Sequence, residues 1–83
     1  MDRHSHRFVE DYEGLVGFGF DRPTDEATVK VFLQKFSDDT LLKAMIPRLS
    51  DEELGRLFDL ISELLVKRLE KDEYEELFLK EEH

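Results

Sequence analysis

Three glycines stand close together in the stretch GLVGFGFDRPTDE, residues 14–26, directly before a helix start. Glycine-rich turns at this place can bind phosphate, because backbone amides converge on the anion at the positive end of the helix dipole. The spacing here is G-x-x-G-x-G after a helical pattern, whereas the dinucleotide fingerprint is G-x-G-x-x-G after a strand. No G-K-[ST] follows, and two acidic residues open the next helix, where they would repel phosphate. We therefore interpret the segment as a helix stop and a turn, in which at least one of Gly14, Gly17 and Gly19 has positive φ.

The three histidines are the candidate metal ligands. His4 and His6 are two residues apart, so on a helix they point away from each other, whereas helical ligand pairs stand four residues apart. His83 is distant in sequence, and the chain has no cysteine that could supply a thiolate. An amino-terminal copper site needs a histidine at the third position, and here it is the fourth. The pattern predicts no metal site.

Carboxylates and hydroxyls are numerous but poorly arranged for catalysis. Asp59 and Glu63 share one helix face, and it is the polar face, whereas a general acid or base needs a partly buried carboxyl group with a raised pKa. No serine has a histidine in a supporting position by sequence. Three of the four serines are in positions typical of helix starts; the four are Ser5, Ser37, Ser50 and Ser62. We expect no catalytic residue, no cofactor and no enzyme activity.

Composition and charge exclude further classes of function. The chain has 83 residues, 40% of them hydrophobic and 40% charged, which favours one folded, well-solvated domain over residues 1–83. The formal net charge is −9, and residues 37–83 carry 14 Asp+Glu against 7 Lys+Arg. Such a surface repels phosphate backbones, so we expect no direct binding of nucleic acid. The polar N-terminus and the lack of a long apolar run favour a cytoplasmic protein without a membrane segment.

The elements that position these residues are helical, because apolar residues recur every three or four positions and no alternation persists. The pattern predicts helices over residues 5–16, 25–36, about 41–46, 51–70 and about 74–78. Pro47 ends or kinks the third helix, since proline lacks an amide donor. Gly14–Gly17 should cap the first helix, with Phe18 and Phe20 holding the turn against the core.

Helix-start signals agree with this periodicity. Ser50 and Glu53 have the spacing of a capping box, in which each side chain accepts a hydrogen bond from the backbone amide of the other. Thr24, followed by two acidic residues, indicates a second helix start, and S-D-D at 37–39 indicates a third. On the exposed side of the fourth helix, Glu63 and Lys67 are spaced for a stabilising ion pair.

The fourth helix, residues 51–70, carries apolar residues over about half of its circumference, more than a peripheral helix needs. It therefore touches neighbours on two sides, either as the central helix of the bundle or in contact with another chain. We expect its most buried positions to be Leu57, Ile61, Leu64 and Leu65, with Ile61 or Leu64 to Ala costing about 2–5 kcal/mol. Val31 and Val66 lie outside the apolar arcs and are expected to be exposed.

The sequence thus predicts an all-α compact bundle of four to five short helices, with the helix of residues 51–70 central. Its leading functional interpretation is a protein–protein interaction or regulatory module that binds a second copy of itself or a basic protein. The alternative is an acidic nucleic-acid mimic that inhibits a basic DNA- or RNA-binding protein. Its phosphate-like row would consist of the acidic residues at successive helix starts: Asp38, Asp39, Asp51, Glu52, Asp72, Glu73, Glu75 and Glu76. Lys67, Arg68 and Lys71 would interrupt that row.

Overall fold

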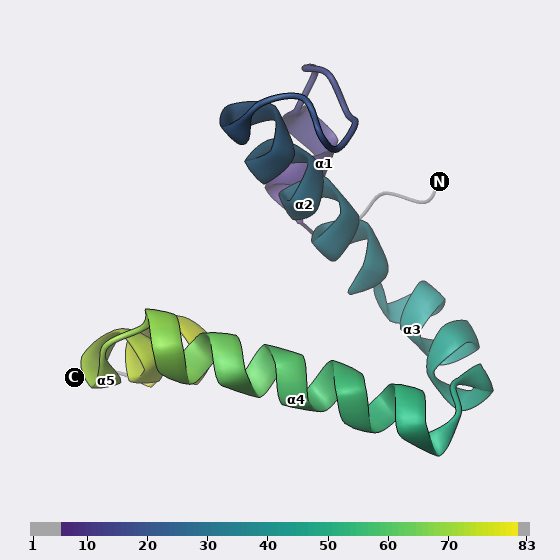
Figure 1. Ribbon diagram of the computed structural model, residues 1–83, viewed down its shortest axis with the longest axis vertical. Helices are drawn as coiled ribbons and strands as arrows, with labels where there is room; N and C mark the ends of the chain where they lie inside the picture. The colour runs from purple at the N-terminus through teal and green to yellow at the C-terminus, as the bar shows by residue number, and fades with distance from the viewer. Residues whose placement is uncertain (1–5, 82–83) are drawn as a thin grey trace. The chain divides into compact units, whose positions relative to one another are not determined.

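The computed structural model describes residues 6–81, and within that range the chain is helical and has no strand. Its α-helices are α1 (Arg7–Asp11), α2 (Arg22–Phe36), α3 (Asp39–Met45), α4 (Asp51–Arg68) and α5 (Lys71–Glu73) (Figure 1). A 3-10 turn, η1 (Ile46–Arg48), follows α3 and contains Pro47, as expected, and a π-helical turn, η2 (Tyr74–Phe78), continues α5. The predicted all-α fold is confirmed. No helix in the described range is both long and apolar enough to cross a bilayer.

The chain divides into two compact units, residues 1–48 and residues 49–83. The first unit contains α1, α2, α3 and η1, and the second contains α4, α5 and η2. Each unit has its own packing and is described by itself. One domain over residues 1–83, with the fourth helix at the centre of a single bundle, stays a prediction.

Local side-chain caps fix the helix starts. Ser50 and Glu53 form the expected capping box on α4: the Glu53 amide donates to Ser50 Oγ at 3.1 Å, and the Ser50 amide donates to Glu53 Oε1 at 2.8 Å. Asp38 caps α3 by accepting from the amides of Thr40 and Leu41. Both starts follow from the sequence because each cap lies within three residues of the amides it satisfies.

The start of α2 differs from the expected one. Its cap is Asp21, whose carboxylate accepts from the Thr24 amide at 2.9 Å, so Thr24 itself is inside the helix. Pro23 lies in the first turn, where its missing amide costs nothing because that amide would have no helical partner. The helix start indicated at Thr24 is therefore three residues too late. Thr24 and its two acidic neighbours are typical of a helix start, but Asp21 precedes Pro23 at the spacing of a cap and a first-turn proline.

The first helix is also shorter than expected. α1 ends at Asp11, and Tyr12 leaves it with an extended backbone, so the prediction of a glycine cap at Gly14–Gly17 is wrong. The Tyr12 ring stacks on Phe8 with centroids 5.2 Å apart, and its hydroxyl donates to the Leu15 carbonyl at 2.9 Å. These contacts turn the chain before the apolar periodicity ends.

The core of the first unit lies between α1, the glycine turn and one face of α2. The buried residues of the described range are Thr28 and Val31, which are 4% and 6% exposed. The expectation that Val31 is exposed is therefore wrong. The turn packs on this face because Thr28 Oγ1 accepts from the Gly17 amide at 2.9 Å and donates to its carbonyl at 3.0 Å. Backbone groups that lose contact with water when the turn packs need polar partners, and Thr28 supplies them on this face of α2.

The second unit leaves α4 more exposed than expected. None of the four positions expected to be most buried is buried: Ile61 and Leu64 are 44% and 49% exposed, and Leu57 and Leu65 are half-buried. The prediction of maximal burial at these positions is wrong because the only elements beside α4 in its unit are the short α5 and η2. Val66, at 79%, is exposed as expected.

Candidate interaction surface

Three backbone amides of the glycine turn, those of Gly17, Gly19 and Phe20, already have side-chain acceptors in α2. Gly19 has φ of 97°, which confirms the expected left-handed residue, and its amide donates to Asp25 Oδ1 at 2.8 Å. The Phe20 amide points to the same oxygen at 3.3 Å, and the Gly17 amide is held by Thr28. A carboxylate thus occupies the position that a bound phosphate would take. The arrangement supports a structural role for the turn.

Asp21 is the carboxylate in this region whose ionisation the structure visibly perturbs. The backbone amide of Thr24 and then its hydroxyl hydrogen-bond to the carboxylate and hold the pKa of Asp21 below its ordinary value of 3.8. A hydrogen bond to the ionised form stabilises it, and the positive end of α2 favours negative charge. Asp21 is therefore ionised at neutral pH and acts as a cap.

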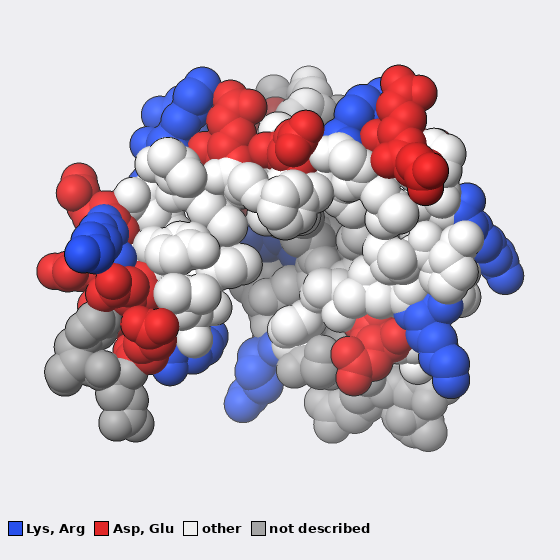
Figure 2. All heavy atoms as spheres, turned by 90° about the horizontal axis from the view of Figure 1, so that it is seen from below, with Lys and Arg blue, Asp and Glu red and all other residues white. Residues whose placement is uncertain are grey.

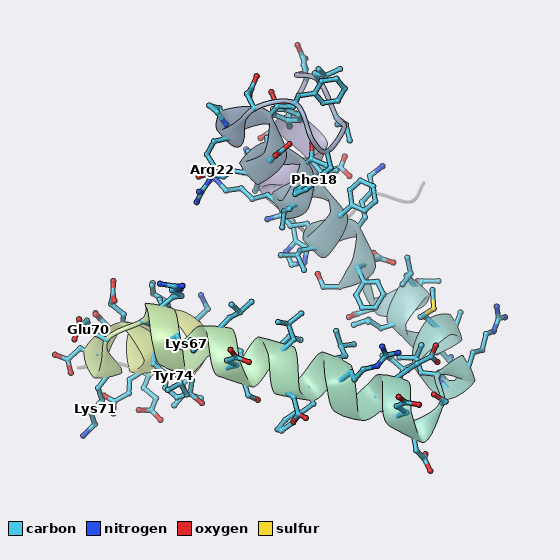
Figure 3. The ribbon with its side chains drawn as sticks, in the orientation of Figure 1. Phe18, Arg22, Lys67, Glu70, Lys71 and Tyr74 are labelled. Atoms are coloured by element: carbon cyan, nitrogen blue, oxygen red, sulfur yellow. The ribbon has the colours of Figure 1, made fainter. Side chains whose placement is uncertain are left out.

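The aromatic residues beside this turn do not hold it against the core. Phe18 and Phe20 are both exposed, so that prediction is wrong. Phe18 lies with Arg22, Asp25, Val29 and Lys30 around a shallow hollow on α2, and Figure 3 shows Phe18 and Arg22 at this end of the unit. Hydrogen bonds from the amides of the turn to Thr28 and Asp25 hold its backbone against α2, and the Phe18 and Phe20 rings remain exposed.

His6, the histidine within residues 6–81, is not part of a group that could bind a metal ion. His6 Nε2 hydrogen-bonds to Ser37 Oγ at 2.7 Å, which ties the start of α1 to the end of α2. No group of three or more histidines and carboxylates among residues 6–81 is placed to hold a metal ion. His4 and His83 lie outside the described residues, as does Ser5.

Asp59 and Glu63 lie on the exposed side of α4, as the pattern indicated. Glu63 Oε2 is 2.9 Å from Lys67 Nζ, so the expected ion pair is present. A general acid or base needs a partly buried carboxyl group, and neither carboxylate is buried. An ion pair four residues apart on an exposed helix face stabilises the helix by about 0.2–0.5 kcal/mol.

Exposed apolar side chains are the feature that the structure does bring together. On α2 they recur at helical spacing and form one stripe: Val29, Phe32, Leu33 and Phe36. Phe32 is 63% exposed and Phe36 is half-buried. The turn packs on α2 at Thr28 and leaves this stripe largely uncovered within its unit. Helical periodicity in the sequence marks the stripe, but it does not indicate which face of α2 the turn covers.

In the second unit an apolar groove of about 540 Å³ runs between α4 and the segment formed by α5 and η2. Within that segment, the Tyr74 and Phe78 rings stack with centroids 5.3 Å apart. The groove is lined by Phe58, Ile61, Ser62, Leu65, Val66, Leu69, Lys71, Tyr74 and Phe78. Lys67, Glu70, Lys71 and Tyr74 gather at the C-terminal end of α4, as Figure 3 shows.

A second apolar side of α4 lies outside this groove. Leu54, Leu60 and Leu64 are exposed, and Leu57 is half-buried. At about 100° per residue, the centre of this side is roughly a third of the circumference away from the centre of the groove, and Ile61 lies between the two. The expectation that α4 carries more apolar surface than one neighbour can cover is thus met within its own unit.

Acidic residues outnumber basic residues in this unit, and the two kinds are unevenly distributed along α4. Residues 49–83 carry 12 Asp+Glu and 5 Lys+Arg, and the described acidic and basic side chains are interspersed on the face seen in Figure 2. On α4 the two signs separate by position: Asp51, Glu52 and Glu53 occupy the first turn, and Lys67 and Arg68 occupy the last. The helix therefore has an acidic start and a basic end.

Comparison of the chain with models of protein families, with curated proteins and with solved structures finds no match.

Proposed function

We propose that this protein is a non-catalytic protein–protein interaction module that associates through the apolar faces of its helices, including association with itself. One observation carries the proposal: within residues 6–81 the single buried hydrophobic residue is Val31, while large apolar side chains on α2 and α4 are exposed in rows. Isolated exposed apolar residues are ordinary, whereas contiguous apolar faces are typical of contact surfaces.

Burial in a complex would complete the hydrophobic contacts that each unit lacks. A small domain buries a modest fraction of its surface, so association is a common source of additional stability. The acidic surroundings would keep the unbound protein dispersed and would favour a basic partner over an acidic one. A protein that buries its apolar faces only when it binds a partner would suit a regulatory role.

Sedimentation velocity between about 1 and 300 μM tests self-association. We expect the weight-average sedimentation coefficient to rise with concentration. Replacing Leu60 and Leu64 by Asp should suppress the rise, because a carboxylate would have to be desolvated on the contact face. A coefficient that stays at the monomer value for the native chain removes the self-association part of the proposal.

Capture of partners from the native cell, with the same double variant as the control, tests binding to other proteins. A partner that uses α4 must be captured by the native chain and lost with the variant. A partner held equally by both would place the contact elsewhere. If no protein is captured and the native chain is a strict monomer, the interaction module is contradicted as a whole.

The nucleic-acid mimic stays a prediction, and no contact in the described structure favours it over the module. Its row would need acidic side chains at regular spacing without interruption. Lys67 and Arg68, in the last turn of α4, and Lys71, at the start of α5, place positive charge between its members on α4 and those that follow Lys71. Competition by nucleic acid distinguishes the two hypotheses: a mimic requires a nucleic-acid-binding partner from which DNA or RNA displaces this protein.

A further inference from the structure

The exposed side of α4 has the spacing of a helix–helix seam. Leu54, Leu57, Ile61 and Leu64 follow one another at intervals of three, four and three residues, which is the a/d pattern of a coiled coil. None of the four is buried, although all are apolar. α5 and η2 occupy the neighbouring side of α4, so within this unit they leave the seam uncovered and the groove stays as it is when a second helix lies along the seam.

The charges at the two ends of α4 decide the direction in which a second helix fits. The first turn is acidic, with Asp51, Glu52 and Glu53, and the last turn is basic, with Lys67 and Arg68. A parallel pair of α4 helices would place like charges together at both ends. An antiparallel pair places each acidic start beside a basic end, and the two helix dipoles then also oppose each other.

The antiparallel register follows from the seam. Leu54 of one copy lies in a layer with Leu64 of the second copy, and Leu57 lies with Ile61 of the second copy. Leu60, next to the seam on the side away from the groove, then meets Leu60 of the second copy near the two-fold axis. On the same flank Glu53 lies opposite Lys67 of the second copy, and this pairing occurs twice.

The contact area indicates a weak, reversible dimer. α4 has 18 residues and is therefore about 27 Å long, so a seam about 10 Å wide covers roughly 300 Å² of each copy. Standard stable interfaces bury about 800 Å² per partner. A short seam of this size forms and dissociates quickly, and trapping by a cross-linker suits it better than isolation of the complex.

We propose that α4 pairs antiparallel with α4 of a second copy of this chain, along Leu54, Leu57, Ile61 and Leu64. This inference rests on the proposed interaction module and names its partner and geometry. The acidic start of each α4 then lies beside the basic end of α4 in the other copy. α5 and η2 remain on the side of each α4 that carries the groove.

Single cysteines test the register, because the native chain contains none. Each variant is treated, at about 100 μM, with a bifunctional thiol reagent that spans about 8 Å. We expect Leu60→Cys to form a covalent dimer with at least tenfold greater yield than Val66→Cys, an exposed control on the opposite side of α4. Leu54→Cys alone should not cross-link, because the two copies of residue 54 are about 15 Å apart along the axis at 1.5 Å per residue.

A mixture of Leu54→Cys and Leu64→Cys should cross-link as a heterodimer, since these positions share a layer. Self-cross-linking of Leu54→Cys with none for Leu60→Cys would show a parallel pair and overturn the inference. Equal yields at Leu60 and Val66 would also overturn it, because that result requires no specific contact. Circular dichroism of each variant checks that the helices are retained.

Sedimentation of the untreated native chain separates the two failures. If the native chain self-associates but the cross-linking pattern is wrong, the interaction module stands and the α4 geometry is rejected. If the native chain is a monomer at every concentration and Leu60→Cys gives no more dimer than Val66→Cys, the inference and the self-association on which it rests both fail.

Discussion

Gly19 is the residue whose backbone most clearly restricts substitution. Its φ of 97° lies in the left-handed region, and no atom lies within 4 Å of the position a Cβ would take, so replacement by Ala causes backbone strain without a clash. We expect Gly19→Ala to lower the free energy of unfolding by more than about 1 kcal/mol. Urea denaturation followed by circular dichroism measures the change.

Gly55 provides the matched control for this prediction. It lies inside α4 and also has open space around its Cβ position. Because Ala is the better helix former, Gly55→Ala should raise the free energy of unfolding by about 0.5–1 kcal/mol. Destabilisation by both substitutions would show that the added methyl group, and not the sign of φ, is responsible.

The amides of the glycine turn should give no nucleotide binding. Asp25 accepts from the amides of Gly19 and Phe20, and a phosphate would have to displace this carboxylate. We expect a titration with ATP to leave the amide chemical shifts of residues 17–26 unchanged up to millimolar concentration. Saturable shifts centred on these residues would show that the turn is a binding loop.

Asp21 gives the chain a defined dependence on pH. Its pKa is lowered in the folded state by the Thr24 amide and hydroxyl, so the ionised cap contributes stability above the unfolded-state pKa. That contribution is lost as the pH falls through the lower, folded-state pKa. NMR titration of the Asp21 carboxyl carbon should give a midpoint below 3.8, and Thr24→Ala, which removes the hydroxyl, should move the midpoint upward. A midpoint at or above 3.8 in the native chain would contradict the cap.

Among the elements, α4 is the one whose apolar face we expect to contribute more to association than to folding. Leu64 is half-exposed in the described structure, so the cost of 2–5 kcal/mol that applies to buried leucines is too large for the single chain. We expect Leu64→Ala to change the helix content little but to weaken self-association at least tenfold, which corresponds to about 1.4 kcal/mol. Sedimentation velocity at several concentrations measures the dissociation constant.

Val66→Ala is the comparison for Leu64→Ala on the same helix. Val66 is more exposed than Leu64 and lies away from the seam, so its truncation should leave the dissociation constant within about twofold of the native value. A similar loss of association for both variants would indicate nonspecific apolar contact.

Net charge acts on the whole molecule and opposes self-association. Each copy carries a formal charge of −9, whereas the two Glu53–Lys67 pairs expected in the dimer are exposed and worth about 0.2–1 kcal/mol each. General repulsion should therefore outweigh local attraction at low salt. Because the Debye length falls from about 30 Å at 0.01 M to about 8 Å at 0.15 M, we expect salt to tighten the dimer severalfold over this range. Weakening by salt, measured by sedimentation, would mean that the ion pairs dominate.

Much of the fold follows from local sequence. The Ser50–Glu53 capping box, the Asp38 cap, the Glu63–Lys67 pair and the positive φ in the glycine turn were all predictable. Each of the first three joins residues no more than four positions apart, and the fourth needs only glycine's freedom at φ. The helical class is determined in the same way, by apolar residues that recur at helical spacing.

Tertiary structure alone decided which faces are covered. Thr28 binds Gly17 across 11 residues, Gln34 accepts from the Val9 amide across 25, and His6 meets Ser37 across 31. These bonds bring α1 and the turn onto the Thr28 and Val31 side of α2 and leave the Phe32 side exposed. Periodicity identifies an apolar face, but it does not say where distant backbone amides find acceptors. The Val9 and Gly17 amides are part-buried and find their acceptors on α2, so hydrogen bonding, and not apolarity alone, selects the side of α2 that became the core.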